Sequence, residues 1–448
     1  MHTLKTFQSR IKKITQQMKK TSLMVLYNPP AVKRNGDVMY EYRGDSNFLY
    51  VTGINMPDII FCIDCHGESW IFLPKRTDEQ IRWMGEVVSL QELRQLGIPK
   101  KNILTKDDFQ KHFAELLKSY QTLYCSFGEN SHFENTLFQY IRQAVLGQYR
   151  AGILPISLRH VSEIFYPLRQ IKEQEEIQIL KEGCGLNAQI HNDLIRFSKS
   201  QTFPLWERDL KAYLESKMRF YRAERLAYPS IVAGGNRANI LHYEKSNGKI
   251  SKKDLVLVDA GLEWKYYATD ITRTFPAGGK FTYAQKTIYE IVLSAQKKAI
   301  QKCKPNSNLD KVHKAALQEI VKGLWDLGFF KKVPSLDNPD QWERPKTMSE
   351  VFKKKLYRHF YMHSTSHWLG LDVHDVGIYR DKKQAISLKP NMVFTVEPGI
   401  YISKDYDFVP REFRGIGIRI EDDILITPQS YEVLTKDAVK EIEEIESI

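Results

Sequence analysis

The 448-residue sequence predicts two domains, an α/β domain followed by an α+β domain in which helices cover one side of a curved antiparallel sheet. Up to residue 165, apolar segments typical of strands alternate with amphipathic segments typical of helices. Beyond residue 172, long amphipathic helices flank segments that predict antiparallel hairpins. We therefore place the boundary at residues 166–172 and assign residues 1–168 and 169–448 to the two domains.

The elements of the first domain follow one another at short intervals. The segments with the amphipathic pattern of helices are 9–20, 89–97 and 107–120. The apolar segments expected to form strands are 22–27, 47–53, 59–65 and 69–74. Because the last two predict a hairpin that turns at residues 66–68, we do not interpret the Cys-x-x-Cys-His pattern at 62–66 as a haem attachment site or a redox motif.

The second domain begins with a long amphipathic helix over residues 172–197. The segment 255–275 predicts two strands joined by a turn near residues 263–265. Two further helices are expected around residues 288–295 and 312–324, each with apolar side chains on one face. The polar, proline-containing segment 331–350 predicts a surface loop.

The charge and hydropathy of the chain exclude two broad classes of partner. The net charge is +12, but acidic residues are interleaved with the basic ones and no nucleic-acid-binding motif accompanies them, so no nucleic acid is expected. No apolar run approaches the 18 residues that a membrane span requires.

The cysteine count and the N-terminal segment bear on the compartment. An odd number of cysteines, five, in a chain without an apolar signal sequence predicts reduced thiols in the cytoplasm. The first 36 residues contain no acidic side chain, as in an organellar transit peptide. The basic helix at 9–20 nevertheless runs directly into the strand at 22–27, which the first domain needs, so we favour the cytoplasm.

Two acidic residues lie on the hairpin predicted for residues 255–275. If the hairpin folds about its middle, Asp259 and Asp270 face each other with Cβ atoms roughly 5 Å apart. Like charges at that separation destabilise a sheet unless a cation lies between them. The pair taken alone is also compatible with two solvated carboxylates, because acidic side chains are commonly exposed.

Two glutamates occupy comparable positions at strands near the C-terminus. Glu397 ends an apolar segment just before Pro398, which interrupts strand pairing. Between residues 416 and 421, strict alternation places isoleucines on one face and both Arg419 and Glu421 on the other. Arg419 is therefore positioned to orient a metal-binding carboxylate.

His367 supplies an imidazole to this set of candidates. It is one of three histidines in a short segment, with His363 and His374, and no glutamate completes an HExxH motif. A lone histidine is more often structural than a ligand. Together with Asp259, Asp270, Glu397 and Glu421, however, His367 completes a set of four carboxylates and one imidazole, which suits two hard divalent cations that activate water for hydrolysis.

Several segments of the chain resemble the signature blocks of the pita-bread metallopeptidases, and most closely those of the Xaa-Pro aminopeptidase (aminopeptidase P) family. The blocks are VDAGLEWKYYATDITRTFP, MHSTSHWLGLDVHDVG, TVEPGIY, RGIGIRIEDD, YPSIV, ILHY and, near the N-terminus, YRGDSNFLYVTGI. The resemblance covers nearly the whole chain. It implies a creatinase-like α/β domain over residues 1–168 and a pita-bread metallopeptidase domain over residues 169–448. The implied activity is release of the N-terminal residue from peptides with proline in the second position.

The resemblance further implies a dinuclear centre, for which mixed oxygen and nitrogen ligation suits Mn²⁺. In that arrangement Asp259 binds one ion, Asp270 and Glu421 bridge both, and His367 and Glu397 complete the second. A metal-bridged hydroxide would attack the peptide carbonyl, and Glu397 would take and return the proton.

The other residues carried over from the family surround the substrate. His242 or His374 would stabilise the oxyanion, and His363 and Tyr401 would contact the proline ring. Arg419 and Tyr228 would support the ligands.

The sequence departs from the family pattern at two positions. Ser364 stands where the family usually has glycine after the residue corresponding to His363, which changes the backbone at that point. Asn47 stands where the family usually has aspartate, which removes a charge expected at a subunit boundary. Neither change removes a ligand.

Three functions and two assemblies remain open from the sequence. An Xaa-Pro aminopeptidase is favoured, a prolidase that cleaves only Xaa-Pro dipeptides is the alternative, and a pita-bread binding module without catalysis is disfavoured because every ligand is present. A homodimer or a homotetramer is expected. Trp83 resembles a tryptophan that some relatives contribute across a subunit interface, although burial within its own domain is an equally good interpretation.

Overall fold

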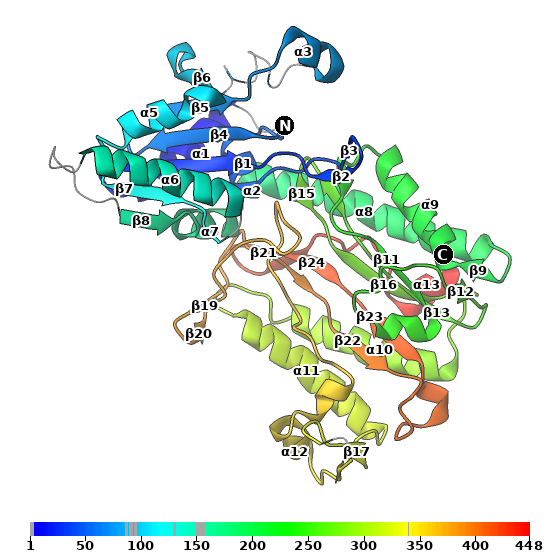
Figure 1. The fold of residues 1–448 in the computed structure, drawn as a ribbon. Helices are drawn as coiled ribbons and strands as arrows, with labels where there is room; N and C mark the ends of the chain where they lie inside the picture. The colour runs from blue at the N-terminus through cyan, green and yellow to red at the C-terminus, as the bar shows by residue number, and fades with distance from the viewer. Residues whose placement is uncertain are drawn as a thin grey trace. The chain divides into compact units, whose positions relative to one another are not determined.

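The computed structural model describes residues 4–85, 88, 93, 96–128, 131–148, 157–338 and 340–448. The chain divides into two compact units, Met1–Leu168 and Arg169–Ile448, which are traced from blue to red in Figure 1. The first unit is α/β and the second is built from antiparallel strands and long helices, so the predicted fold class is confirmed.

The first unit is organised around a six-stranded mixed sheet with the order β6-β5-β4-β1-β7-β8. The central strand β1 pairs antiparallel with β4 and parallel with β7. The strands are β1 (Ser22–Asn28), β4 (Ile59–Asp64), β5 (Ser69–Leu73), β6 (Ile103–Thr105), β7 (Thr122–Cys125) and β8 (Ser157–His160). A separate hairpin consists of β2 (Lys33–Asn35) and β3 (Val38–Met39). The helices are α1 (Leu4–Gln17), α2 (Ser46–Thr52), α3 (Asp78–Met84), α5 (Phe109–Leu116), α6 (Ser131–Gln148) and α7 (Ser162–Gln170).

One predicted strand of the first unit is a helix. Residues 47–53 were expected in a sheet because they are apolar and aromatic, but they lie in α2. The Asp45 side chain accepts a hydrogen bond from the Phe48 N–H, which starts the helix, and Gly53 ends it in the left-handed region at φ 69°. All of α2 is buried, so its sequence lacks the polar face that would have indicated a helix. The helix expected at 89–97 lies largely outside the described residues.

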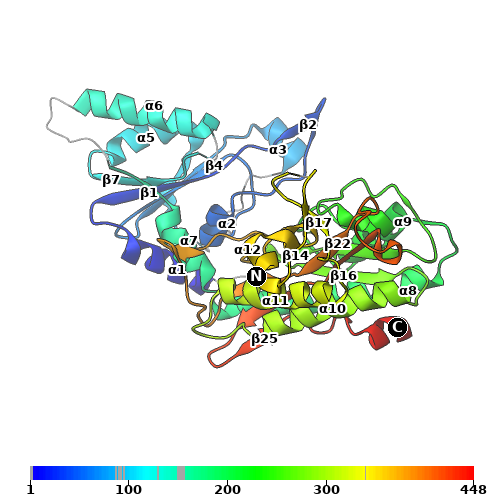
Figure 2. The same cartoon turned by 90° about the horizontal axis from the view of Figure 1, so that it is seen from below.

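The second unit places long helices against antiparallel strands. Its main helices are α8 (Gln174–Ser200), α9 (Glu207–Phe220), α10 (Tyr283–Ile300) and α11 (Leu309–Asp326). Figure 2 shows α8, α10 and α11 running along one side of the strands. None of the helices in the described residues is long and apolar enough to cross a membrane.

The strands of the second unit form small antiparallel sheets that share this helical cover. One sheet contains β11 (Ile231–Gly234), β13 (Leu255–Ala260) and β16 (Ile271–Pro276). Another contains β21 (Val393–Val396), β24 (Asp422–Ile426) and β25 (Tyr431–Val433). Further antiparallel pairs are β22 (Gly399–Ile402) with β23 (Ile416–Arg419), β9 (Leu205–Trp206) with β12 (Lys249–Ile250), and β19 (Arg380–Asp381) with β20 (Gln384–Ala385). A small three-stranded sheet contains β10 (Arg225–Leu226), β14 (Leu262–Trp264) and β15 (Tyr267–Ala268).

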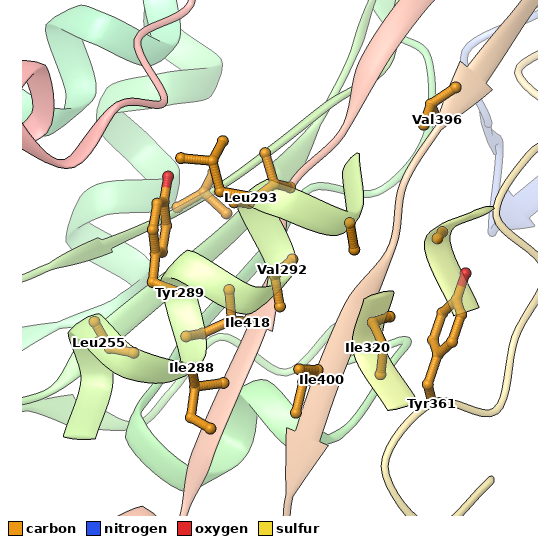
Figure 3. Close-up of a cluster of buried hydrophobic side chains, with 14 of the residues drawn as sticks. Leu255, Ile288, Tyr289, Val292, Leu293, Ile320, Tyr361, Val396, Ile400 and Ile418 are labelled. Carbon is orange, nitrogen blue, oxygen red and sulfur yellow. The ribbon is translucent and has the colours of Figure 1, made fainter. Parts of the chain in front are cut away.

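The core of this unit lies between the helices and the sheet. Figure 3 shows Ile288 and Val292 of α10 beside Ile400 of β22 and Ile418 of β23, and all four side chains are fully buried. Burying a side chain of this size stabilises the fold by about 1.5–3 kcal/mol. The apolar face predicted for residues 288–295 therefore packs against β22 and β23 and holds these strands in place. Arg419, one of the candidate site residues, lies on β23.

The register of the β13–β16 hairpin differs from the sequence-based expectation. Asp259 pairs with Thr272, so Asp259 and Asp270 are diagonal neighbours on one face and are not directly opposed. The turn is centred on Lys265 and Tyr266, which both have positive φ, 50° and 70°. Two-residue hairpin turns of this kind usually carry Asn and Gly, so Lys-Tyr did not mark the exact point of reversal, which lies at the C-terminal end of the turn predicted near residues 263–265.

The segment expected to be a surface loop contains short elements. Residues 331–350 include a two-stranded pair, β17 (Val333–Pro334) with β18 (Trp342–Glu343), and the start of α12 (Met348–Lys353). Most of the described residues of this segment are nevertheless exposed, in agreement with the predicted surface position.

Candidate metal centre

A cavity of about 640 Å³ opens in the second unit and is lined by side chains from strands and from the segments that connect them. Its lining includes the predicted ligands and histidines, namely His242, Asp259, Asp270, His363, His367, His374, Glu397 and Glu421, together with Tyr228 and Arg419. The structure therefore brings these positions together from distant parts of the chain. Tyr401 adjoins this set through His363.

Three of the predicted ligands form a compact buried cluster. One side-chain ligand atom from each of Asp270, His367 and Glu421 lies within 4.8 Å of the other two. His367 Nε2 lies 3.4 Å from an Asp270 carboxylate oxygen and 3.8 Å from one of Glu397. This spacing suits a divalent cation held between the side chains.

Backbone pairing explains why His367 and Glu397 are neighbours. The Thr395 N–H donates to the His367 carbonyl at 3.0 Å, and the Glu397 N–H donates to the Thr365 carbonyl at 2.9 Å. The segment around His367 thus runs beside the end of β21, where Glu397 leaves the strand. Glu421 is fixed against the β16 strand, because its N–H donates to the Thr272 carbonyl and its carboxylate accepts from the Thr272 hydroxyl at 2.6 Å.

Tyr228 and Arg419 hold the acids of the hairpin. The Tyr228 hydroxyl lies 2.6 Å from an Asp259 carboxylate oxygen and also contacts Asp270. The Arg419 guanidinium pairs with the other oxygen of Asp259 at 2.5 Å. The predicted contact of Arg419 with a ligand carboxylate is therefore present. Tyr228 contacts both Asp259 and Asp270 and so fixes the positions of these two diagonal neighbours.

The electrostatics of the cluster favour a bound cation. Burial, followed by the charges of neighbouring carboxylates, raises the pKa of Glu421 well above its usual range. Burial likewise raises the pKa of Asp270, and it raises the pKa of Glu397 to about 7 although His367 and Arg419 act in the opposite direction. Carboxylates gathered in a low-dielectric cavity need positive charge in order to ionise together. The donor set of oxygen atoms and one imidazole therefore fits divalent metal ions.

The tautomer of His367 leaves its inner nitrogen available. Nδ1 lies 3.1 Å from the Trp368 carbonyl, which can only accept, so Nδ1 carries the hydrogen. Nε2 consequently faces Asp270 and Glu397. Burial disfavours the charged ring, but the hydrogen bond and charge of Asp270 raise the pKa of His367 to about 9. A metal ion at Nε2 would replace this proton.

A directed chain of hydrogen bonds orders His363. Arg419 Nη1 donates to the Tyr401 hydroxyl oxygen at 3.0 Å, and that hydroxyl lies 2.9 Å from His363 Nε2. Nδ1 of His363 lies 2.8 Å from the Ser364 carbonyl and must donate to it. In the neutral ring Nε2 then accepts from the Tyr401 hydroxyl. Burial, reinforced by the Arg419 charge, lowers the pKa of His363 to about 4, which agrees with this assignment.

His374 stacks on His367, with ring centroids 4.0 Å apart and an interplanar angle of 18°. Partial burial and the adjacent His367 lower the pKa of His374 to about 4. The next residue, Asp375, is buried and is paired with Arg169 and, at 2.8 Å, with Lys172. This ion cluster was not predicted from the sequence, although the acidic residue directly after His374 was visible there.

The positions that depart from the family pattern lie in ordered surroundings. Ser364 lines the cavity and is exposed. Asn47 is buried within α2. Trp83 at the end of α3 is 82% exposed, so the interpretation that it is buried in its own domain is wrong.

Comparisons with known proteins agree with this geometry. The family model for metallopeptidase family M24 matches residues 178–428, and the model for the aminopeptidase P N-terminal domain matches residues 7–124. The chain is 34% identical to the Xaa-Pro aminopeptidase of Escherichia coli over 99% of this chain and 97% of that protein.

Solved structures give the same result. The aminopeptidase of Pseudomonas aeruginosa superposes with a TM-score of 0.91 at 34% identity, covering 99% of this chain and 97% of that one. Escherichia coli aminopeptidase P with the inhibitor Pro-Leu superposes with a TM-score of 0.90 at 32% identity, covering 100% and 98% of the two chains.

Fold and site thus define a metal-dependent peptidase built on the pita-bread fold. The chain belongs to metallopeptidase family M24 and, within it, to the aminopeptidase P family. The resemblance inferred from the sequence blocks is confirmed.

We expect the thermal stability of the metal-free protein to fall as pH rises from 7 to 9. An unfolded histidine titrates near pH 6.5, whereas His367 in the folded metal-free chain titrates at about 9. Between these two pKa values the folded state retains a proton that the unfolded state has lost. The stabilisation that protonated His367 gives to the folded state is therefore complete below the pKa of the unfolded chain and disappears as the pH passes the pKa of the folded chain. The lowered pKa values of His363 and His374 act below pH 6.5 and do not contribute here.

The measurement is the Tm of metal-free and Mn²⁺-loaded protein between pH 7 and 9. The difference in Tm between the Mn²⁺-loaded and the metal-free protein should widen as the pH rises. In metal-free His367→Gln, the part of the decrease in Tm that is due to the imidazole of His367 should be absent. A constant difference across the window would contradict the assignment.

Proposed function

We propose that this protein is an Xaa-Pro aminopeptidase, which releases the N-terminal residue from peptides with proline in the second position. The observation that carries the proposal is full-length similarity to an enzyme of that name combined with the buried Asp270, His367 and Glu421 cluster. A binding module without catalysis would have no use for a complete set of ligands in a cavity of this size.

We assign two divalent ions, with Mn²⁺ as the preferred metal, to five ligands: Asp259, Asp270, His367, Glu397 and Glu421. The family resemblance assigns Asp270 and Glu421 to the bridging positions, and both carboxylates lie in the buried cluster with His367. Bound ions of this type supply Lewis acidity and lower the pKa of water enough to provide a nucleophile near neutral pH.

The side chains around the ions hold protons and orient the substrate. Glu397 is the proposed general base, since a carboxylate at the metal site would contact the metal-bound water and could take and return its proton. His242 and His374 line the same cavity and are assigned to the oxyanion of the tetrahedral intermediate. His363 and Tyr401 are assigned to the proline ring, which has no amide hydrogen to satisfy.

Peptides of three or more residues with proline second should be cleaved at least as efficiently as Xaa-Pro dipeptides. A dipeptidase gains affinity by pairing the substrate carboxylate with a fixed cation, usually arginine. Arg419 is already engaged with Asp259 and Tyr401, so it is not available for that task. The test compares kcat/KM for an Xaa-Pro dipeptide and an Xaa-Pro-Yaa tripeptide, with Mn²⁺-loaded enzyme. A steep decrease in kcat/KM when the substrate is extended beyond the proline would identify the enzyme as a prolidase.

We further propose that the units 1–168 and 169–448 are the creatinase-like and catalytic domains, and that the protein acts in the cytoplasm as a homodimer or homotetramer. All five cysteines are free, which fits a reducing compartment. Trp83 and Met84 are 82% and 60% exposed side by side on α3, as expected for a surface that contacts a second copy of the chain. The family resemblance assigns Trp83 to a substrate site completed by a neighbouring subunit, and the exposure of this side chain is compatible with that role.

A further inference from the structure

We infer that Glu207 is a positioning residue that fixes His242 in the cavity by closing the loop on which that histidine lies. The inference rests on the proposed oxyanion role of His242 and concerns a residue outside the cavity lining.

Glu207 is the first residue of α9, directly after strand β9. Its side chain is fully buried, and both carboxylate oxygens accept two hydrogen bonds. Oε1 accepts from the Gly234 N–H at 2.8 Å and from the Arg237 guanidinium at 2.5 Å. Oε2 accepts from the Tyr243 hydroxyl at 2.9 Å and from the Gly248 N–H at 2.6 Å. A buried carboxylate with its acceptor sites filled in this way is held in one position.

The four donors are distributed along a single loop. Gly234 ends strand β11, and Gly248 precedes strand β12, so the carboxylate joins the two ends of the loop. The backbone adds a further bond, from the Glu207 N–H to the Gly248 carbonyl at 3.0 Å. Gly248 also packs against the Arg237 guanidinium, which an added Cβ at that position would meet at 2.3 Å.

The remaining donor, Tyr243, transmits this constraint to the cavity. Leu241, His242 and Glu244 line the cavity, whereas Tyr243 is 6% exposed and packs with Ile231 and other buried residues behind it. His242 itself is exposed, and its neighbour in the chain is the anchored residue. Fixing the Tyr243 hydroxyl therefore fixes the backbone from which the imidazole projects.

The chemistry of the four partners requires a carboxylate at position 207. Two of them are backbone N–H groups and one is an arginine, which can only donate. A glutamine would turn its NH₂ group toward a donor on one side of the loop and leave a buried N–H unsatisfied. Glu207→Gln should therefore loosen the loop although it preserves the side-chain shape.

The decisive experiment is a double-mutant cycle between Tyr243→Phe and His242→Ala, measured on the full-length Mn²⁺-loaded enzyme. We expect His242→Ala to lower kcat by about 100-fold, as for loss of an oxyanion partner. Tyr243→Phe should lower kcat by about tenfold, since misplacing a catalytic group by a fraction of an ångström has effects of this order. In the His242→Ala background, Tyr243→Phe should have no further effect on kcat, because its action passes through the imidazole.

A matched control separates positioning from loss of stability. Tyr289→Phe removes another buried hydroxyl, which donates to the Lys440 carbonyl at 2.8 Å, from a residue seen in the core in Figure 3. Both Tyr→Phe variants should lower Tm by similar amounts, but only Tyr243→Phe should lower kcat. Glu207→Gln should also lower kcat, by about 100-fold, which is a larger decrease than that expected for Tyr243→Phe.

Additive effects of Tyr243→Phe and His242→Ala on kcat, in an enzyme that does require His242, would overturn the positioning role and leave the proposed function intact. Equal losses of kcat in Tyr243→Phe and Tyr289→Phe would overturn it as well. Near wild-type kcat in His242→Ala would overturn the oxyanion role and the inference together.

Discussion

Removal of divalent metal should abolish peptidase activity, and Mn²⁺ or Co²⁺ should restore it better than Mg²⁺. The reason is the buried cluster of Asp270, His367 and Glu421, in which burial raises the pKa of both acids and a bound cation would allow them to ionise together. A donor set that mixes oxygen atoms with an imidazole nitrogen suits Mn²⁺ or Co²⁺, whereas Mg²⁺ prefers oxygen ligands and retains its water.

The measurement is turnover of an Xaa-Pro-Yaa tripeptide after dialysis against a chelator and after stepwise addition of each metal, with bound metal determined in parallel. Activity should rise with bound Mn²⁺ until the sites are filled. An Arg380→Ala variant, which alters an exposed ion pair with Asp310, should titrate like the wild type and serves as a control for handling. Full turnover by protein that contains no metal would end the metallopeptidase assignment.

The second large effect is expected from substitution of Glu397 and of His374. The two substitutions should lower turnover for different reasons. Glu397→Ala removes a carboxylate 3.8 Å from His367 Nε2 and the proposed general base, so both metal content and kcat should fall. His374→Ala removes a ring that stacks on His367 without being one of the assigned ligands, so metal content should be retained. Loss of one oxyanion partner lowers kcat by about 100-fold or more.

The matched control for these variants is His359→Ala. His359 is a half-buried imidazole of the same unit, its Nε2 lies 2.8 Å from the Pro334 carbonyl, and it is absent from the cavity lining. This variant should keep both metal and kcat. Near wild-type kcat in His374→Ala would show that the oxyanion assignment is wrong, and unchanged metal content in Glu397→Ala would remove Glu397 from the ligand set.

Local patterns were sufficient to locate most of the strands and helices that carry the site. Alternation around β23 placed Ile418 in the core and Arg419 with Glu421 on the polar side, because a period of two residues is fixed by the strand itself. The apolar face of α10 was likewise visible, since residues three and four apart share one side of a helix.

Local patterns failed where burial or turn geometry overrode them. Residues 47–53 look like a strand because aromatic and β-branched side chains dominate, yet they form a helix that is buried on every side and capped by Asp45. The register of the β13–β16 hairpin depended on two residues with positive φ, Lys265 and Tyr266, whose side chains do not favour that conformation.

The sequence by itself determined which side chains have the chemistry of a metal centre and which strand faces they occupy, because both follow from residue type and short-range periodicity. Only the tertiary structure decided which of them meet. Tyr228 joins Asp259 to Asp270, Lys172 reaches Asp375 across 203 positions of the chain, and Glu207 closes the His242 loop. Contacts of this kind depend on the packing of distant segments around a common core, which no local pattern encodes.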